Sequence, residues 1–291
     1  MRMLELFSGI GGAAAATEGR VEVVAAVDQN PFANQTYAIN FPSHPIQVLN
    51  LAGGVRLPAA DLWWMSPPCQ PYTVRGARRD LDDPRARSLI RLMEALDRYR
   101  PRYLALENVP LFEGSRAHAL VRETLAGAGY QVQEWMLCPT LLGVPFERRR
   151  FYLVAGLGPL RPFDTHQRPL RKIQAYLDPA PAAGLEVTGS LLERYRHAFH
   201  LVEGEGARHG ACFTSAYGRS PVYSGSYLRE GDRLRRFSPE EILRTLHFPA
   251  DYRLPEGLTA ERRYGLVGNS LSVIAVREVL RAIPDLAEPQ A

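Results

Sequence analysis

One stretch of the sequence combines a reactive side chain with a rigid turn. Asp61–Met65 is a short apolar run, and Pro67–Gln70 (Pro-Pro-Cys-Gln) follows it almost at once. Two consecutive prolines fix the backbone and remove two N–H donors, so neither a strand nor a helix continues through them. Cys69 is therefore expected at the rim of the fold, shortly before several arginines. Such a thiol can act as a nucleophile with a lowered pKa; the alternative is an inert cysteine in a buried loop.

A carboxylate and two arginines form a second candidate group. Glu107 follows the buried run Tyr103–Leu106, and parallel sheets bind their ligands at this end of a strand. Capping the next helix is the alternative role. Arg148 and Arg150 precede or begin the predicted strand Phe151–Ala155, and alternate side chains of an extended chain share one face. Two arginines on one face suit an anionic or carbonyl-bearing ligand; a solvated charged surface is the alternative.

The N-terminal segment has the pattern of a site for an adenosine-containing cofactor. The apolar run Met3–Phe7 precedes Ser8–Gly12 (Ser-Gly-Ile-Gly-Gly) and an alanine-rich helix. Glycines let the backbone approach a ligand, and the amides at the helix start would face it. The same residues match G-x-G-x-x-A, so an NAD-dependent protein stays open. Asp28, after the strand Val21–Val27, is placed to accept ribose hydroxyls or to cap the helix from Pro31.

Strands and helices alternate around these residues. Further strands are expected at Ile46–Leu51 and Gln131–Leu137, and helices at Arg87–Tyr99 and Ser115–Ala128. This alternation predicts an α/β fold with a doubly wound, mostly parallel sheet.

The composition changes after Ala155. Between Pro159 and Arg236 there are 12 basic residues against 8 acidic ones, an excess that equals the net charge of +4 for the whole chain. Apart from an expected helix at Leu191–Leu201, this segment has weak periodicity. Basic and aromatic residues together suit phosphate contacts and base stacking, and a solvated lid is the alternative. The interleaved aromatic residues are Tyr195, Phe213, Tyr217, Tyr223 and Tyr227.

Regular structure is expected to return at Phe237. Ser238 and Glu241 have the spacing of a capping box that begins a helix. Another helix is expected from Ala260 to Tyr264. Gly268–Ser270 is expected to open a final helix from Leu271 to Ala282, with polar groups that cap it or hold a carboxylate.

The composition limits the classes of protein that fit. The 291 residues are 46% hydrophobic and 23% charged, as in globular proteins. The three cysteines, Cys69, Cys138 and Cys212, give neither a metal-ligand spacing nor a disulfide framework. No apolar run approaches the roughly 20 residues that cross a bilayer, and Met1 leads directly into a strand. We therefore expect no metal, no signal peptide, no membrane partner and a cytoplasmic location.

The motifs occur in the order seen in cytosine-5 methyltransferases, and the chain resembles that superfamily over nearly its whole length. They are Phe7–Gly11, Pro67–Gln70, Glu107–Val109, Arg148–Arg150 and Gly268–Ser270. Finer features look like the tRNA-aspartate cytosine-5 methyltransferase branch: Ser66–Thr73, Cys212–Thr214, Ala216–Gly218 and Arg263–Leu271. The chain departs from the family at Phe146, where DNA enzymes often have glutamine, at Asn50, where they have an acidic residue, and at Ser215, where the tRNA enzymes have lysine.

The resemblance implies a fold and a substrate. The fold is a Rossmann-like S-adenosylmethionine-dependent methyltransferase domain with a small loop-rich target-recognition segment. Residues 1–156 would be the catalytic domain, 157–232 the recognition segment, and 233–291 a return to the catalytic domain. The substrate would be a cytosine in the anticodon loop of tRNA, with DNA as the alternative, and the enzyme would act as a monomer.

The resemblance also implies roles for individual residues. The Cys69 thiolate would add to carbon 6 of cytosine, Glu107 would meet ring nitrogen 3, and Arg148 would hold the base carbonyl with support from Arg150. S-adenosylmethionine would bind to Phe7, Gly9, Ile10, Gly11, Gly12, Asp28, Asn50, Leu51, Pro67, Asn269 and Ser270. The nucleic acid would contact Arg78, Arg79, Cys212, Phe213 and Thr214.

Overall fold

The computed structural model divides the chain into two compact units. It describes residues 1–51, 56–73, 79–180, 183–187, 189–195, 197–206 and 209–287. The first unit comprises Met1–Leu137, Arg149–Thr165 and Val276–Ala291, and the second comprises Cys138–Arg148 and His166–Ala275. These boundaries differ from the ranges expected from the sequence: residues 138–148 and 233–275 lie in the second unit, and residues 157–165 lie in the first. Because compactness assigns no role, target recognition by residues 157–232 stays a prediction.

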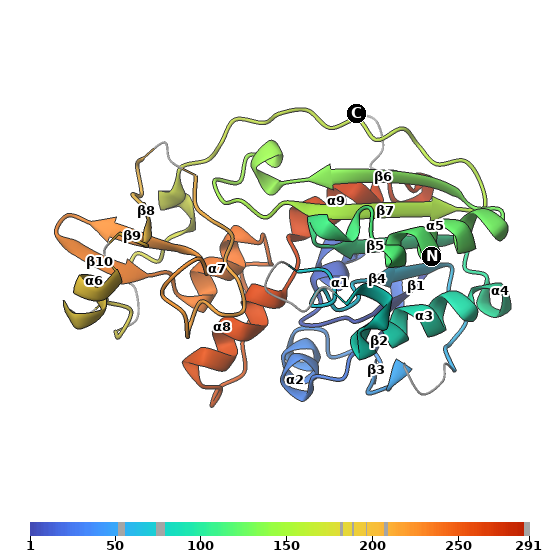
Figure 1. Cartoon of the computed structure of the whole chain (residues 1–291), viewed down its shortest axis with the longest axis horizontal. Coiled ribbons are helices and arrows are strands. Elements are labelled where there is room, and N and C mark those ends of the chain that lie inside the picture. The colour runs from blue at the N-terminus through green and yellow to red at the C-terminus, as the bar shows by residue number, and fades with distance from the viewer. Residues whose placement is uncertain are drawn as a thin grey trace. The chain divides into compact units, whose positions relative to one another are not determined.

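The first unit is built on a seven-stranded sheet with the order β3-β2-β1-β4-β5-β7-β6 (Figure 1). Strands β1 to β5 run parallel, whereas β7 is antiparallel to both β5 and β6. This is the expected α/β fold with a mostly parallel sheet. The strands are β1 (Arg2–Leu6), β2 (Glu22–Val27), β3 (Ile46–Gln47), β4 (Leu62–Met65), β5 (Tyr103–Asn108), β6 (Gln131–Leu137) and β7 (Arg150–Gly156).

Side-chain alternation along β1 assigns its two faces. Leu4 and Leu6 belong to one hydrophobic core, together with residues of α3 and α5. Glu5, between them, points to the opposite face and meets the backbone of α1. The helices of this unit are α1 (Gly12–Thr17), α2 (Pro31–Asn40), α3 (Arg87–Glu94), α4 (Leu96–Tyr99), α5 (Arg116–Gly127) and α9 (Val273–Leu280), which begins in the second unit.

Two expected elements of the first unit are shorter than the sequence indicated. The strand expected at Ile46–Leu51 pairs with β2 only through Ile46 and Gln47, because β3 ends there. The helix expected at Arg87–Tyr99 is interrupted at Ala95, where its backbone N–H bonds to both Arg91 O and Met93 O. These boundaries depend on backbone geometry that apolar spacing does not encode.

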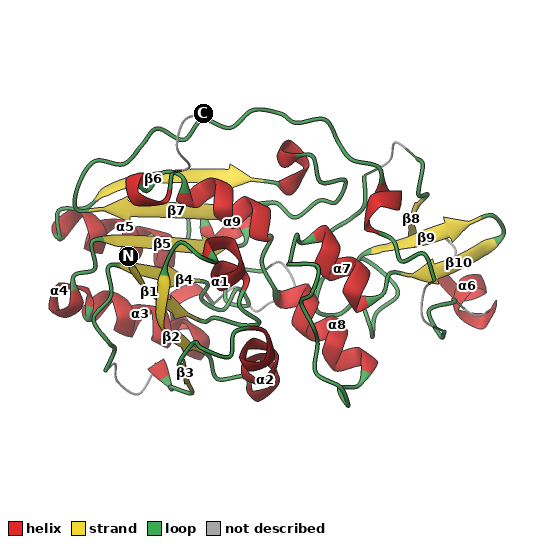
Figure 2. Cartoon of the chain, turned by 180° about the vertical axis from the view of Figure 1, so that it is seen from behind, coloured by secondary structure: helices red, strands yellow, loops and turns green. Residues whose placement is uncertain are grey.

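Among its described residues, the second unit contains a three-stranded sheet with the order β10-β9-β8 and the α-helices α6, α7 and α8 (Figure 2). The prediction of one helix over Leu191–Leu201 is wrong after Tyr195. The Phe199 ring packs on Tyr227 with centroids 4.5 Å apart, and the chain then pairs with β9. The elements are α6 (Gly189–Tyr195), β8 (His200–Val202), β9 (Ser226–Glu230), β10 (Arg233–Arg236), α7 (Pro239–Thr245) and α8 (Ala260–Asn269).

Aromatic side chains fill the interior of the second unit. The rings of Phe213, Tyr217 and Tyr227 are at most 5% exposed, so they are not available for the base stacking expected from the sequence. They pack with Phe237 and other rings at centroid distances of 5.0 to 5.6 Å.

A buried ion pair joins β10 to α7. The Glu241 carboxylate is fully buried and accepts two hydrogen bonds from Arg235, at 2.8 and 2.9 Å. It also accepts the Ser238 N–H, while Ser238 Oγ accepts the Glu241 N–H. The capping box predicted at the start of this helix is thereby confirmed.

The expected final helix is present as α9, but Gly268 and Asn269 belong to the end of α8 instead of opening it, which corrects the expectation. α8 continues through Asn269, and Ser270 is its C-cap residue. A Cβ on Gly268 would lie 2.3 to 2.4 Å from the backbone of Thr214 and Ser215. Glycine therefore allows the end of α8 to approach that segment closely.

Candidate active site

Cys69 lies in a turn that leaves the end of β4. Its carbonyl accepts the Tyr72 N–H at 2.9 Å, which closes the turn, and its side chain is partly exposed. Two residues earlier, Pro67 O accepts Asn108 Nδ2 at 3.1 Å. Asn108 is the last residue of β5, so this bond fixes the cysteine turn to the end of the neighbouring parallel strand.

Glu107 and Arg150 meet at the same end of the sheet. The side chain of Glu107 is 10% exposed, and Arg150 Nε lies 3.3 Å from its Oε1. Arg150 begins β7, which runs antiparallel to β5, so the first residue of one strand comes beside the end of the other. The structure therefore brings together a nearly buried carboxylate and an arginine at the end of β5, the strand that is bonded to the cysteine turn.

Arg85 is an arginine near Cys69 that the sequence analysis did not single out. Arg85 makes two hydrogen bonds of 2.7 and 2.8 Å to the carboxylate of Asp83, whose side chain is 4% exposed. These bonds hold the pKa of Asp83 at about 2, below its usual value. The pKa of Arg85 is raised, mainly by Asp83 and in addition by the charge of Cys69, so Arg85 lies within electrostatic reach of the thiol. The signal was a charged pair two residues apart around Pro84.

The glycine turn after β1 has the backbone geometry of a ligand loop. Phe7, Gly9 and Gly11 have positive φ angles of 57, 53 and 85°. A Cβ on Gly11 would lie 2.6 Å from the Phe41 ring, so only glycine fits there. A Cβ on Gly9 would meet no other atom within 4 Å, so its backbone faces open space.

Asp28 holds this turn from the end of β2. Its Oδ2 accepts the Gly9 N–H at 2.8 Å, and its Oδ1 accepts the Asn30 N–H at 2.8 Å. The cap of α2 is supplied by Asn30 instead, which accepts the Phe32 and Ala33 N–H groups. The carboxylate thus positions the glycine turn, and its oxygens have remaining lone pairs for ribose hydroxyls.

Two amides at the start of α1, where the sequence analysis expected a ligand, are bonded to a side chain of the protein itself. Glu5 Oε1 accepts the N–H groups of Ala13 and Ala14 at 3.1 and 3.4 Å, and its Oε2 accepts the Tyr37 hydroxyl at 2.8 Å. Burial raises the pKa of this carboxyl to about 7, against the lowering effect of these hydrogen bonds. Sequence alone gave no sign of this role, because Glu5 lies inside an apolar strand.

The other expected cofactor residues of the first unit line the ends of its first strands. Ile10, Gly12, Leu51 and Pro67 are buried, and Asn50 is exposed, with its Oδ1 3.5 Å from Gln29 Nε2. The buried hydroxyl of Ser8, within the turn, has no hydrogen-bond partner among the described residues. A bare glycine backbone, an unsatisfied hydroxyl and a carboxylate at the second strand fit a polar cofactor with a ribose.

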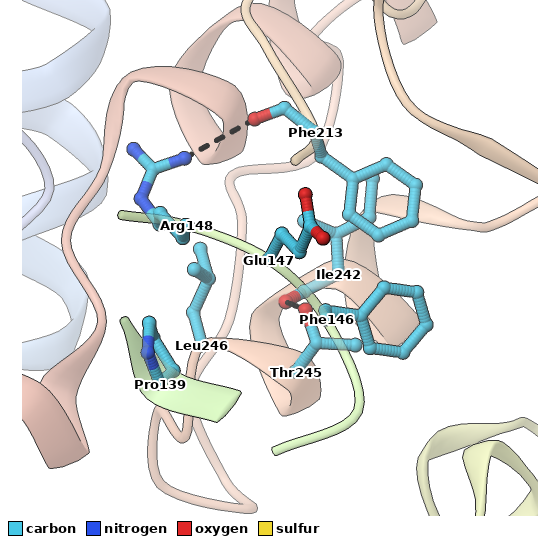
Figure 3. A pocket seen from close by; sticks show the side chains of 8 residues that line it. All are labelled: Pro139, Phe146, Glu147, Arg148, Phe213, Ile242, Thr245 and Leu246. Atoms are coloured by element: carbon cyan, nitrogen blue, oxygen red, sulfur yellow. Dashed lines mark hydrogen bonds between the residues drawn. The ribbon is translucent and has the colours of Figure 1, made fainter. Parts of the chain in front are cut away.

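Arg148 belongs to the second unit, where its guanidinium donates to main-chain carbonyls; Figure 3 shows the bond to Phe213. Nη1 donates to Phe213 O at 3.1 Å and lies 3.5 Å from Cys212 Sγ, while Nη2 donates to Gly268 O at 3.2 Å and to Ser270 O. The side chain is 6% exposed. A cavity of about 10 Å³ beside it has room for one water molecule at most.

The expectation that Arg148 and Arg150 share one face of a strand is wrong. β7 begins at Arg150, and Arg148 lies outside it. The reason is that Phe146 forms a bridge with Gly210 and the Glu147 N–H bonds to Gly210 O at 2.8 Å, within the second unit. The two arginines therefore belong to different units.

The other residues that were expected to contact the cofactor or the nucleic acid differ in their burial and hydrogen bonding. Thr214 donates its N–H to Ser224 O and accepts the Ala216 N–H, so it orders a turn. Asn269 is exposed and Ser270 is buried, next to Arg148. Arg79 is exposed, whereas Arg78 lies outside the described residues.

Among the described residues, no three His, Cys, Asp or Glu side chains are grouped so that they could hold a metal ion. No helix within the described ranges is both long and apolar enough to cross a bilayer.

The fold and these sites define a class. A mostly parallel sheet with a glycine turn after β1 and an acidic residue after β2 is the architecture of Rossmann-like methyltransferases. The chain belongs to the C-5 cytosine-specific DNA methylase family, whose model matches residues 1–176, and is a cytosine-5 methyltransferase. The resemblance predicted from the sequence is thus confirmed.

Several relatives match the chain over nearly its whole length. The chain is 30% identical to the tRNA (cytosine(38)-C(5))-methyltransferase of Schizosaccharomyces pombe, over 95% of this chain and 94% of that protein. It is 29% identical to the human protein of the same name, over 97% and 99%. A solved Entamoeba histolytica methyltransferase is 26% identical, with a TM-score of 0.90 over 99% of both chains.

Proposed function

We propose that the protein methylates carbon 5 of a cytosine in the anticodon loop of tRNA, at position 38, using S-adenosylmethionine. Support comes from similarity along the whole chain to enzymes named for that reaction, not only in the catalytic motifs. The compact segment between Arg150 and Arg236 is in keeping with an RNA loop as substrate. We place the enzyme in the cytoplasm, acting as a monomer.

One observation carries the proposed chemistry: Arg150 contacts Glu107 on β5, the strand whose last residue, Asn108, is bonded to the Cys69 turn. Carbon 5 of cytosine is a poor nucleophile. Addition of the Cys69 thiolate to carbon 6 forms a C–S bond and moves the ring electrons toward carbon 5 and nitrogen 3. A reactive thiolate is favoured by nearby positive charge.

Glu107 and the two arginines would stabilise the charge that this addition creates. A proton shared between Glu107 and ring nitrogen 3 neutralises the ring, and Arg150 holds the carboxyl group in place. Arg148 would hold the base carbonyl. Its guanidinium is fixed by carbonyls from Phe213, Gly268 and Ser270, so little rotamer freedom is left to lose when a base binds.

The first unit would hold the cofactor. Phe7, the open backbone at Gly9 and the Ser8 hydroxyl would meet its methionine and adenosine parts, with Asp28 at the ribose. When bound, S-adenosylmethionine supplies the methyl group for carbon 5. A base then takes the carbon 5 proton, the C–H electrons re-form the ring double bond, and the C–S bond breaks to restore the Cys69 thiolate.

A loop substrate also explains why a small recognition segment can suffice. The target base must leave its stack to reach Cys69, and this costs less in an RNA loop than in a duplex. Arg78 and Arg79, which follow the cysteine turn, would contact phosphates. Cys212–Thr214 would act close to the base through Arg148, since this segment binds that side chain directly.

A covalent trap tests the proposal. A tRNA carrying 5-fluorocytosine at position 38 cannot lose the group at carbon 5 as a cation, so the adduct should accumulate. With S-adenosylmethionine present, we expect a denaturant-stable protein–RNA band from the wild type and none from Cys69→Ala. The matched control, Cys138→Ser, should form the band. No band from the wild type, or a band from Cys69→Ala, would reject the covalent mechanism.

A further inference from the structure

Tyr223 has the properties of a platform for an unpaired base. Five aromatic residues of the recognition segment were candidates for stacking, and three of them are buried. Tyr195 is partly buried on α6. Tyr223 is 80% exposed, more than any other large hydrophobic side chain in the part of the chain that the structure describes.

The backbone of Tyr223 is held in an unfavourable conformation. Its φ angle is +54°, in the left-handed region that aromatic residues rarely adopt. Such strain persists only where the surroundings fix it, and it concentrates at functional positions. Here the neighbours are fixed on both sides: Ser220 Oγ donates to Val222 O at 3.1 Å, and the buried Ser224 donates its hydroxyl to Ser220 O.

The loop that presents Tyr223 is tied to the segment that holds Arg148. Ser224 O accepts the Thr214 N–H at 2.8 Å. A Cβ on Gly225 would lie 2.5 Å from the Phe213 ring, so glycine lets the loop pack directly on that buried ring. Phe213 in turn accepts the hydrogen bond from Arg148 Nη1. The exposed ring and the expected base-holding arginine thus belong to one connected framework within the second unit.

The charge of the second unit favours RNA as the occupant. It contains 16 Lys and Arg residues against 13 Asp and Glu residues, most of the chain's net charge of +4. Arg219, on the Tyr223 loop, is 60% exposed and lies 3.4 Å from the equally exposed Glu261. Exposed pairs of this kind are weak, so the guanidinium can exchange its partner for a phosphate.

We propose that Tyr223 stacks on an unpaired nucleotide next to the target cytosine, and so selects a single-stranded loop over a duplex. This inference rests on the proposed tRNA substrate and adds a recognition residue to it. Stacking on an aromatic ring is tolerant of base identity, because every base has a flat face. It requires an unstacked base, which an anticodon loop supplies and an intact duplex does not.

Steady-state kinetics with an anticodon stem–loop RNA test the proposal. Tyr223→Ala should raise the KM for RNA about 5- to 140-fold, the range of base–aromatic stacking. The kcat and the KM for S-adenosylmethionine should stay within about twofold, because the ring contributes binding only. Tyr223→Phe, which keeps the ring, and the control Leu170→Ala, which removes another exposed side chain of this unit, should both resemble the wild type.

Two results would overturn the proposal. One is an unchanged RNA KM in Tyr223→Ala, and the other is an equal loss in Tyr223→Phe, which would assign the effect to the hydroxyl. If the wild type methylates no tRNA, the proposed function fails instead. Fluorescence anisotropy with the same hairpin then decides: weaker binding by Tyr223→Ala and normal binding by Tyr223→Phe keep the stacking role, and any other pattern removes it.

Discussion

Replacing Glu5 by glutamine should remove a pH dependence from the stability of the first unit. The carboxyl group is fully buried between β1 and α1, where burial raises its pKa from 4.5 to about 7. The groups that face it are the Ala13 and Ala14 amides, the Tyr37 hydroxyl and, by charge alone, Asp28. Glutamine has the same shape and can accept the two amides, so the variant should fold.

The direction and the size of this pH dependence follow from the raised pKa of Glu5. The folded protein binds the Glu5 proton more tightly than the unfolded chain does, so protonation stabilises the fold below about pH 4.5. This contribution is lost as the pH rises to about 7, where the buried carboxyl ionises. At about 1.4 kcal/mol per pKa unit, the rise from 4.5 to about 7 corresponds to about 3 kcal/mol.

Denaturant unfolding between pH 4 and 8 measures this effect. The three tryptophans, Trp63, Trp64 and Trp135, all lie in the first unit, so their fluorescence reports its unfolding alone. The free energy of unfolding of Glu5→Gln, relative to the wild type, should rise by about 3 kcal/mol across this range. Other titrating groups cancel in the difference. Glu18→Gln, at an exposed position nearby, should show no such rise. A pH-independent difference for Glu5→Gln would refute the reasoning.

Three further substitutions test other parts of the molecule. Cys69→Ala should abolish methyl transfer and leave the affinity for S-adenosylmethionine nearly unchanged by calorimetry; substantial residual transfer would exclude a covalent step. Asp28→Ala should weaken cofactor binding by about 1–3 kcal/mol, because it removes both the proposed ribose acceptor and the bond to Gly9; equal affinity would remove Asp28 from the site. Glu241→Ala leaves Arg235 buried without its main partner and should lower the unfolding free energy of the second unit by about 3–5 kcal/mol. Amide hydrogen exchange measures this loss, and unchanged protection of β10 would contradict it.

The sequence predicted the parallel sheet and most of its strands well, because their signals are local. Runs such as Leu62–Met65 and Tyr103–Leu106 are apolar throughout, as expected for strands that are covered on both faces. The contact between Glu107 and Arg150 was not predicted, because it depends on β7 lying antiparallel beside β5, which local signals do not indicate. Family motifs then supplied the chemistry.

The errors arose where long-range contacts decide the structure. Arg148 lies outside β7 because Phe146 and Glu147 pair with Gly210, more than 60 residues away in the chain. Gly268, expected to open the final helix, lies at the end of α8, packed closely against Thr214, and the final helix begins only at Val273. Glu5 was missed for the same reason: its partners come from α1 and α2, and a glutamate in a strand gives no hint of them.

The identity of the nucleic acid is best tested by methyl transfer from labelled S-adenosylmethionine, offered total tRNA and unmethylated genomic DNA side by side. Cys69→Ala serves as the control in both reactions. The predicted result is label in tRNA, mapped to cytosine 38, that disappears with the variant. Label in DNA alone would contradict the proposed substrate, and would assign the second unit to reading a duplex instead.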